Sequence, residues 1–572
     1  MLDLIIRNGT VVDGTGAPGV RADLGIQGGR IAAIGAVDES ARRTIDAEGK
    51  VVAPGFVDIH THYDAQVFWD TTLSPWPLHG VTTVIGGNCG FTIAPLEPEH
   101  GDYLMRMLAR VEGMPIGALE SGVPWDWRSF GEYLDRIDGT LAPNAGFLVG
   151  HSTIRRVVMG DRATKGEASA DDVAAMRELL GASLAAGGMG FSSSWARTHN
   201  DAAGDMVPSR YANEDEMVAL CRVVRDHPGT TLEFIPCVGL FEDFAPEIMT
   251  KMSVAADRPV NWNVLFVGKH SDAMTDHNLG ASDYARERGG RVLALTVPFV
   301  PSPRICFDNG FLLDTIPGWE KPMALPHDEK KAMLASRDGR AVLRDAASQP
   351  STGFQLGNWG VYVINETFAA ENKRWEGKQV SEIAAARGVD EFDALCDIVV
   401  ADDLMTGFGF PSRPDDDETW QARMKVWRDG RAVVGASDAG AHLDFLATFN
   451  YSTVLLGEPV RARGLMPIEE AVHLLTDVPA RLYGIKDRGR IADGWHADIV
   501  VIDPETVGPQ PVRMRFDLPT GAPRLYGGAD GIDHVLVNGA EIVDHGEFTD
   551  ARPGTLLRSG RDTETVTASG RP

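Results

Sequence analysis

The sequence predicts an α/β protein, a TIM-like (β/α)8 barrel with a small discontinuous β-sandwich domain built from both chain ends. Apolar strand-like segments alternate with helix-like segments through the middle of the chain, which favours a parallel sheet with helical crossovers. Turn-rich β segments occur at both ends of the chain. A length of 572 residues exceeds one compact core, so we expect one large domain with smaller appended parts.

The barrel is expected over residues 56–484. Its helices begin at polar caps, since Ser169 precedes one helical run and Asn213 precedes the next. The eight strands that a closed barrel needs are expected at 51–59, 81–86, 146–150, 188–191, 232–235, 260–267, 291–297 and 431–435. Two long inserts, at about 96–140 and 300–360, are expected to form lids or binding surfaces.

Residues 1–55 and 485–560 are expected to pair into the small β domain. Asn8-Gly9 and Asn538-Gly539 lie in similar strand-and-turn segments at opposite ends of the chain. Domain termini often lie close together, so two such segments can form one sheet. The last segment, 561–572, is rich in Ser, Thr, Gly and Arg and is expected to be a flexible tail.

The composition excludes several classes of function. A net charge of −27 repels phosphate backbones and anionic lipid, so nucleic acid is not expected as a partner. No apolar run approaches the roughly 20 residues of a membrane span, and the N-terminus lacks the pattern of a secretory signal. The five cysteines are scattered without paired spacing, which fits a reducing compartment. We therefore expect a cytoplasmic protein with no membrane partner.

Two histidines directly follow the first predicted barrel strand. Side chains alternate along a strand, so His60 and His62 point to the same side, into the barrel mouth. Two neutral imidazoles there can hold one divalent ion. A lone His-x-His pair is as often structural, but the flanking residues 53–56 and 63–64 favour metal binding here.

Two further residues extend this candidate site. Asp438 ends the last barrel strand, which lies beside the first strand in a closed barrel, so its carboxylate can bind a metal and accept a proton from water. Elsewhere such an aspartate is more often a turn or cap residue. Cys89 follows the second strand, where a thiolate can bind zinc, although a small buried cysteine is the usual alternative.

Four motifs together resemble the amidohydrolase superfamily, and within it the D-aminoacylase (N-acyl-D-amino-acid deacylase) group. They are Gly55-Phe56-Val57-Asp58-Ile59-His60-Thr61-His62-Tyr63-Asp64, Gly87-Asn88-Cys89-Gly90, Gly150-His151-Ser152-Thr153-Ile154-Arg155 and Ala436-Ser437-Asp438. The resemblance implies metal ligands at His60, His62, Cys89 and Asp438, with Asp438 also the catalytic base. The implied metal is zinc, with other divalent ions as alternatives, and the large inserts together with the resemblance suggest a homo-oligomer.

The sequence departs from this group at the fifth and sixth strands. The D-aminoacylases carry a metal-binding histidine at the end of each, whereas 232–236 and 260–264 contain none. Glu233 or Asn263 could substitute as an oxygen ligand, although Glu233 could equally be a satisfied carboxylate inside the barrel. We therefore expect one tightly bound ion per chain.

A second departure concerns the substrate carboxylate. The group has an arginine about a dozen residues beyond the catalytic aspartate, whereas here no arginine occurs before Arg461. The possible substitutes are Arg155, Arg197 and Arg304. Without one, a pocket lined by aromatic residues such as Trp125, Trp127 and Trp319 would favour neutral or bulky amides. His151 and His442 are candidates for polarising a carbonyl or orienting Asp438, or for stabilising loops only.

The leading hypothesis is a metal-dependent hydrolase of a small-molecule amide, an N-acyl amine or N-acyl-D-amino acid, in which Asp438 acts as general base on a metal-activated water. One alternative is a cyclic amidase of the hydantoinase type, which normally carries a carboxylated lysine on the fourth strand. Residues 190–194 contain no lysine, which disfavours it. The other alternative is a catalytically inactive barrel that acts as a binding protein.

Overall fold

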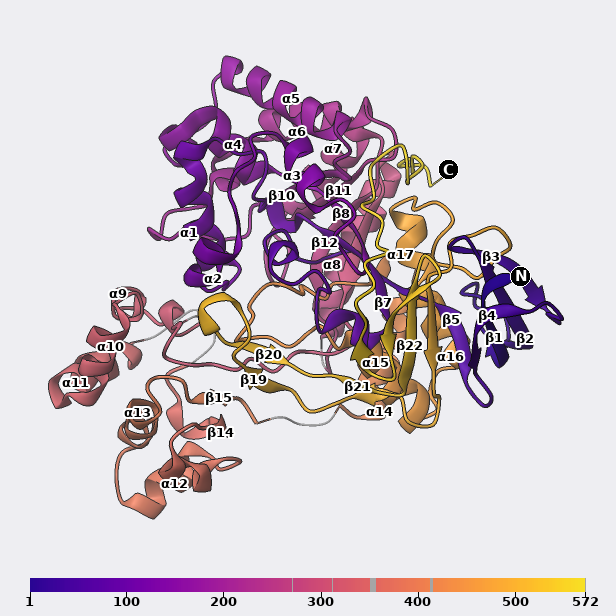
Figure 1. The fold of residues 1–572 in the computed structure, drawn as a ribbon. Coiled ribbons are helices and arrows are strands. Elements are labelled where there is room, and N and C mark those ends of the chain that lie inside the picture. Colours follow the sequence, from indigo (N-terminus) through magenta and orange to yellow (C-terminus); the bar gives the residue numbers. More distant parts are fainter. Residues whose placement is uncertain (270, 311, 350–355, 412–414, 571–572) are drawn as a thin grey trace. The chain divides into compact units, whose positions relative to one another are not determined.

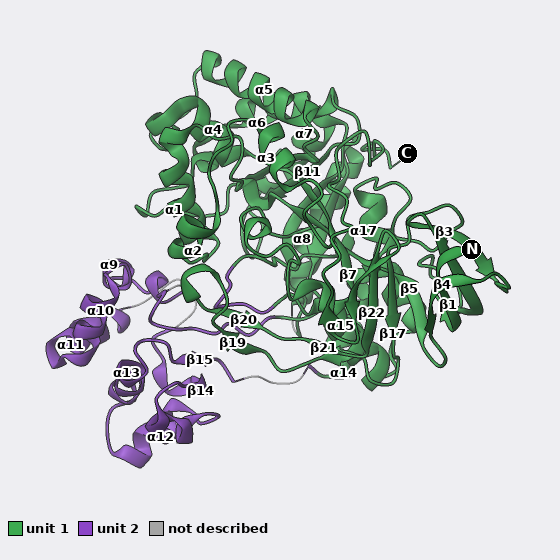
Figure 2. Cartoon of the chain, viewed as in Figure 1, with its two compact units in different colours: residues 1–300, 416–441, 448–572 green, residues 301–415, 442–447 purple. Residues whose placement is uncertain are grey.

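A computed structural model describes residues 1–269, 271–310, 312–349, 356–411 and 415–570. The chain divides into two compact units, one comprising residues 1–300, 416–441 and 448–572 and the other residues 301–415 and 442–447 (Figure 2). Among the described residues, no helix is long and apolar enough to cross a membrane. The chain is of the mixed α/β class, with several separate sheets.

A nine-stranded sheet in the first unit draws its strands from both ends of the chain (Figure 1). Its order is β24-β23-β22-β17-β5-β1-β2-β3, with β4 paired to β1. The strands are β1 (Leu2–Val11), β2 (Val20–Gln27), β3 (Arg30–Gly35), β4 (Ala41–Asp46), β5 (Val51–Pro54), β17 (Ile499–Ile502), β22 (Ile532–Val537), β23 (Ala540–Asp544) and β24 (Glu547–Phe548). The two ends meet where β5 and β17 run antiparallel, with Val51 opposite Ile502. Buried Val52, Ile499 and Leu536 belong to the apolar core of this sheet.

The two Asn-Gly pairs of this sheet differ in structure. Asn538 and Gly539, with φ of 47° and 75°, form the two-residue turn between β22 and β23. Asn8, with φ of 61°, lies inside β1, whose register with β2 shifts between Ile6 and Gly9. The turn expected at Asn8 is therefore a bulge in a continuous strand.

Parallel strands and helices alternate through the rest of the first unit. One sheet contains β6 (Phe56–Asp58), β7 (Val81–Gly86) and β8 (Asn144–Phe147). The other contains β9 (Val149–Gly150), β10 (Gly190–Ser194), β11 (Thr231–Ile235), β12 (Val260–Leu265), β13 (Val292–Thr296) and β16 (Ala432–Val434), in the order β16-β13-β12-β11-β10-β9. Helices α5 (Ala170–Ala185), α6 (Glu214–Arg225), α7 (Phe244–Ala256) and α8 (Asp272–Glu287) connect successive strands of the second sheet. The predicted caps are confirmed, because Ser169 and Asn213 accept the backbone N–H groups of Asp172 and Glu216.

The strand expected at 51–59 is two strands in different sheets, β5 and β6, divided at Gly55. The Gly55 N–H donates to the Asp498 carbonyl at 2.9 Å. A β-carbon at this position would lie 2.2 Å from the Thr82 side chain, so the close approach of the backbone to β7 requires glycine. The break passes the chain from the nine-stranded sheet to the parallel strands.

The insert expected at 96–140 contains α1 (Gly101–Val111), α2 (Ile116–Gly122) and α3 (Phe130–Ile137). Trp127 is buried there, and its indole N–H donates to the Ile93 carbonyl at 2.9 Å. Trp125 is half-buried and stacks on Trp127 at 6.0 Å between ring centroids. Trp127 is thus a core residue and not the exposed aromatic surface that the sequence suggested.

The second unit contains the insert expected at 300–360 and extends beyond it. Its helices are α9 (Glu320–Met323), α10 (His327–Ala335), α11 (Arg337–Ala347), α12 (Val380–Arg387) and α13 (Glu391–Ala401), and β14 (Val363–Glu366) pairs antiparallel with β15 (Gly407–Gly409). Positions 311 and 350–355 of the insert lie outside the described residues. Trp319 is fully buried against Trp359 in the apolar core of this unit, so it is structural rather than part of an open pocket.

Part of 561–572, the segment expected to be a flexible tail, packs against other residues of the first unit. Thr563 is buried, and its hydroxyl donates to the Gly229 carbonyl at 2.6 Å. The Glu564 N–H donates to the Gly484 carbonyl at 2.8 Å. Residues 571–572 of this tail lie outside the described residues.

Candidate metal centre

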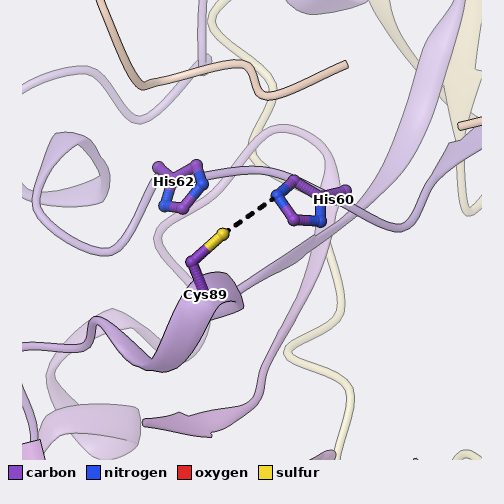
Figure 3. Close-up of side chains that lie close together, drawn as sticks. All are labelled: His60, His62 and Cys89. Carbon is purple, nitrogen blue, oxygen red and sulfur yellow. Dashed lines mark hydrogen bonds between the residues drawn. The ribbon is translucent and has the colours of Figure 1, made fainter. Parts of the chain in front are cut away.

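The ends of β6 and β7 bring together two histidines and a cysteine. His60 and His62 are buried, with 5.4 Å between their ring centroids, and the intervening Thr61 hydroxyl donates to the Ile85 carbonyl. Figure 3 shows the Cys89 sulfur pointing toward the rings, with Sγ 3.6 Å from Nε2 of His60. One ligand atom of each of the three residues lies within 4.8 Å of the others, which is close enough for a single ion to bind all three.

Asp438 lies beside both imidazoles although it follows β16, far from them in sequence. Its Oδ1 atom is 3.0 Å from Nε2 of His62 and 3.5 Å from Nε2 of His60. Backbone hydrogen bonds hold the two segments together, because the Asp438 N–H donates to the His60 carbonyl and the His62 N–H to the Ala439 carbonyl. The Asp438 side chain is 33% exposed, whereas the histidines are buried, so this carboxylate is the part of the cluster that solvent reaches.

A buried glutamate from the first insert completes a second group of ligands. Glu112 follows α1, and its Oε1 atom lies 3.4 Å from Nδ1 of His62. One ligand atom each of His62, Glu112 and Asp438 also lies within 4.8 Å of the other two. The sequence prediction missed Glu112. The signal that could have revealed it is an acidic residue at the C-terminal end of a helix, where the helix dipole disfavours negative charge.

Strands β11 and β12 supply oxygen-bearing side chains where the related group has histidines. The Glu233 carboxylate accepts the Cys89 N–H at 2.8 Å with Oε2, and its Oε1 lies 4.0 Å from Nδ1 of His60. The Asn263 amide nitrogen is 3.5 Å from both the Cys89 sulfur and Nε2 of His60. Rotation of that amide by about 180° exchanges its nitrogen and oxygen, so either atom can face the cluster.

The unsatisfied atoms of this cluster fit a bound cation. Nδ1 of His60, Nδ1 of His62, Oε1 of Glu233 and Oδ1 of Asn263 are buried without a hydrogen-bond partner among the described residues. Each unsatisfied buried polar group costs about 1–3 kcal/mol, so four in one place call for an explanation. A cation among these groups would offset part of this unmet polarity, and a set of imidazole, thiolate and carboxylate groups suits zinc.

Burial dominates the protonation equilibria of the cluster. Burial raises the pKa of Glu233 to about 8 and that of Glu112 to about 7, and it raises the pKa of the Cys89 thiol well above its usual range. Burial lowers the pKa of His60, which leaves this imidazole neutral and able to bind a metal. Burial also opposes the charge on His62, but the nearby Glu112 and Asp438 raise its pKa to about 10. A divalent cation bound there would lower the pKa of the buried acids.

The other predicted site residues have different surroundings. Nδ1 of His151 contacts the Ser193 hydroxyl, and Nε2 contacts the Glu216 carboxylate, each at 2.8 Å. Arg155 forms a buried ion pair with the same Glu216. The sequence prediction missed this glutamate on α6, which contacts both His151 and Arg155.

The remaining candidates lie on the surface or in the second unit. Arg197 is exposed and pairs with Glu242 at 2.9 Å. Arg304 lies in the second unit, where it donates to the Met405 carbonyl at 2.6 Å. His442 belongs to the same unit, and its ring lies 6.0 Å from that of Phe445.

Comparison with known proteins identifies the family. A profile of the amidohydrolase family matches residues 43–543. D-aminoacylase of Alcaligenes xylosoxydans xylosoxydans is 30% identical over 561 residues, which is 97% of each chain. N-acyl-D-glutamate deacylase of the same organism is 30% identical over 571 residues, or 97% of this chain and 96% of that one.

Two solved structures resemble this one over nearly their whole length. A crystal structure of D-aminoacylase covers 98% of this chain and 100% of its own, with a TM-score of 0.63 and 28% identity. N-acyl-D-glutamate deacylase from Bordetella bronchiseptica, solved with zinc and a phosphonate inhibitor, gives the same coverage, a TM-score of 0.63 and 26% identity. Since the profile spans most of the chain and the relatives match end to end, the protein belongs to the amidohydrolase family.

Proposed function

We propose that the protein hydrolyses the amide bond of an N-acyl amine or N-acyl-D-amino acid in a metal-dependent reaction. The observation that carries this proposal is the position of Asp438, whose partly exposed carboxylate lies 3.0 Å from one buried imidazole and 3.5 Å from the other. Relatives named D-aminoacylase and N-acyl-D-glutamate deacylase support this substrate class.

The residues proposed to hold the ion are His60, His62, Cys89 and Asp438. The Glu233 carboxylate, which accepts the Cys89 N–H, lies next to them. Bound there, zinc supplies a Lewis acid that activates water and polarises the scissile carbonyl. Asp438 is proposed to accept the proton of the attacking water and to deliver it to the leaving nitrogen. Its exposure allows it to reach substrate, whereas the buried histidines remain fixed.

We propose one tightly bound ion per chain. A solved D-aminoacylase is described as having a binuclear metal centre with one-metal activation and second-metal attenuation. Here Glu233 on β11 and Asn263 on β12 offer oxygen atoms in place of imidazole. Because zinc prefers imidazole and thiolate ligands, a second zinc ion should bind with lower affinity.

We further propose that the parallel strands close into a (β/α)8 barrel covering residues 56–484, with the small β-sandwich domain formed from 1–55 and 485–560. The parallel pairings of β6 to β8 and of β9 to β16 support it, as does a parallel bridge between Thr61 and Ala439 that links the first strand to the segment after the last. In such a barrel, side chains at the carboxyl ends of the strands converge on one active site.

We also propose a cytoplasmic location and a homo-oligomeric state. The location is supported by the five cysteines, all of which are free thiols. The oligomeric state follows only from the large inserts and the family resemblance, and gel filtration with light scattering tests it directly.

The test of the proposed function is hydrolysis of a panel of N-acyl-D-amino acids and their L enantiomers by the zinc-loaded and metal-stripped protein. We expect release of free amine only from the loaded protein, with restoration by added zinc. A zinc-loaded protein that hydrolyses neither these nor neutral N-acyl amines would contradict the proposal and would favour a binding protein.

A further inference from the structure

A second group of histidines and a carboxylate lies in the nine-stranded sheet, in one hairpin. His534 on β22 and Asp544 on β23 are directly opposite each other in the antiparallel ladder. His545 follows Asp544 in the turn before β24, and its ring lies 4.6 Å from that of His534. One ligand atom from each residue lies within 4.8 Å of the other two. We propose that this hairpin binds a divalent transition-metal ion of the zinc class. The site is separate from the strand-end cluster, the group formed by His60, His62, Cys89 and Asp438 with Glu112, Glu233 and Asn263 around it.

Two carboxylates hold the His534 imidazole. Its Nδ1 atom lies 2.6 Å from Oε1 of Glu541 and 3.4 Å from Oδ1 of Asp544, and His534 and Glu541 are buried. An ionised carboxylate only accepts hydrogen bonds, so the imidazole proton lies on Nδ1 and the lone pair on Nε2. Metal-binding histidines usually donate their other ring N–H to a carboxylate in this way, which fixes both the tautomer and the ring. Glu541 is therefore a positioning residue for the proposed site.

His545 occupies the first position of a tight turn. His545 and Gly546 form a two-residue turn with φ of 47° and 81°, since Asp544 pairs with Glu547 across it. The neighbouring turn between β22 and β23 has nearly the same angles but uses Asn538 and Gly539, the preferred pair for such a turn. Histidine and asparagine both adopt positive φ more often than most residues, so His545 suits the turn that places its ring beside that of His534.

The charges around the hairpin favour a cation. A cavity of about 580 Å³ is lined by all three proposed ligands and by Asp46, Asp533, Arg43 and Lys50. Lys50 pairs with Asp533 at 2.5 Å, and Arg43 pairs with Glu541 at 2.5 Å and with Asp544 at 3.4 Å. The four carboxylates of Asp46, Asp533, Glu541 and Asp544 thus outnumber the two basic side chains. Two imidazoles select zinc, copper or nickel over calcium or magnesium, which prefer oxygen.

The location implies a weaker site than the buried cluster. His534 is buried, Asp544 is half-exposed and His545 is exposed, so solvent competes for the ion and a water completes the coordination. Such an ion should exchange during dialysis, while tying the β23–β24 turn to β22. The site shares no residue with the strand-end cluster, so the test of zinc binding at the hairpin does not depend on the proposed hydrolase activity.

The experiment is a zinc titration of the dialysed full-length protein, monitored by a competing chromophoric chelator. Wild type should bind one more equivalent than His545→Asn, a substitution that removes the ligand but suits the turn. Asp544→Asn should bind zinc at the hairpin at least tenfold more weakly than wild type, and both variants should keep the wild-type hydrolysis rate. His277→Asn is the matched control, because His277 is exposed and lies outside both clusters.

Two results would overturn the proposal. One is an unchanged zinc stoichiometry and affinity in both His545→Asn and Asp544→Asn, with circular dichroism spectra like that of wild type. The other is an equal loss in His277→Asn, which would mean that zinc binds exposed histidines without a built site. In either case Asp544 serves only as an ion-pair partner of Arg43.

Discussion

The two sides of the strand-end cluster differ in ligand chemistry and in how far apart their residues lie in sequence. On one side, His60, His62 and Cys89 come from the adjacent ends of β6 and β7 and offer nitrogen and sulfur. On the other side, Glu233, Asn263 and Glu112 come from β11, β12 and the end of α1 and offer carboxylate or amide groups. Short sequence motifs are therefore enough to predict the nitrogen and sulfur ligands, whereas the positions of the oxygen ligands depend on packing between distant segments.

The largest expected effect on activity is at Asp438, which contacts both histidines and is partly exposed to solvent. Asp438→Asn keeps the size of the side chain but removes its basicity, so kcat should fall by about 100-fold or more while the fold and bound metal persist. Steady-state kinetics on metal-loaded protein measure this. Asp493→Asn is the matched control, because Asp493 is exposed and should leave kcat unchanged. Near-normal turnover in a fully metallated Asp438→Asn variant would remove this residue from the mechanism.

A smaller effect is expected at Glu233. Glu233→Gln retains an oxygen that can accept the Cys89 N–H, yet it removes a negative charge from beside His60. Zinc affinity should fall by about tenfold, the scale seen when a partner of a metal ligand is lost. Competition with a chelator measures the change. If the affinity of the variant equals that of wild type, Glu233 contributes nothing to metal binding.

At Glu112 a similar change should act through His62 alone. Glu112→Gln removes the carboxylate 3.4 Å from Nδ1 of His62, so we expect a loss of zinc affinity smaller than that of Glu233→Gln. Glu120→Gln on α2 of the same insert is the control, because Glu120 is exposed. A loss of zinc affinity larger than that of Glu233→Gln would indicate that Glu112 binds the ion directly and contributes more than Glu233.

The smallest effect concerns the substrate carboxylate. Arg155 pairs with Glu216 and Arg197 pairs with Glu242, so neither cation is uncommitted. We therefore expect kcat/KM for an N-acetyl-D-amino acid to equal or fall slightly below that for its uncharged amide. A strong preference for the free acid would show that a cation does bind the carboxylate. Trp127 and Trp319 are buried, and of the three tryptophans only Trp125 is partly exposed, so this expectation rests mainly on charge.

The sequence predicts local features of the site better than distant ones. His60 and His62 could be placed because strand alternation puts them on one side, and the Thr61 hydrogen bond to Ile85 fits that alternation. Glu112 could not be placed, because its approach to His62 depends on how the insert helix packs. Gly55 shows a further limit. The pattern at 51–59 predicts one strand, but the close approach of the backbone to Thr82 at Gly55 divides it between two sheets.

The most direct test of the central claim is a crystal structure of the zinc-loaded protein with anomalous data at the zinc edge. We expect one strong peak in the strand-end cluster, about 2.0–2.1 Å from an imidazole nitrogen of His60 and of His62 and about 2.3 Å from the Cys89 sulfur. Two peaks of equal height in this cluster, or one peak held by Glu112 and Asp438 without Cys89, would contradict it.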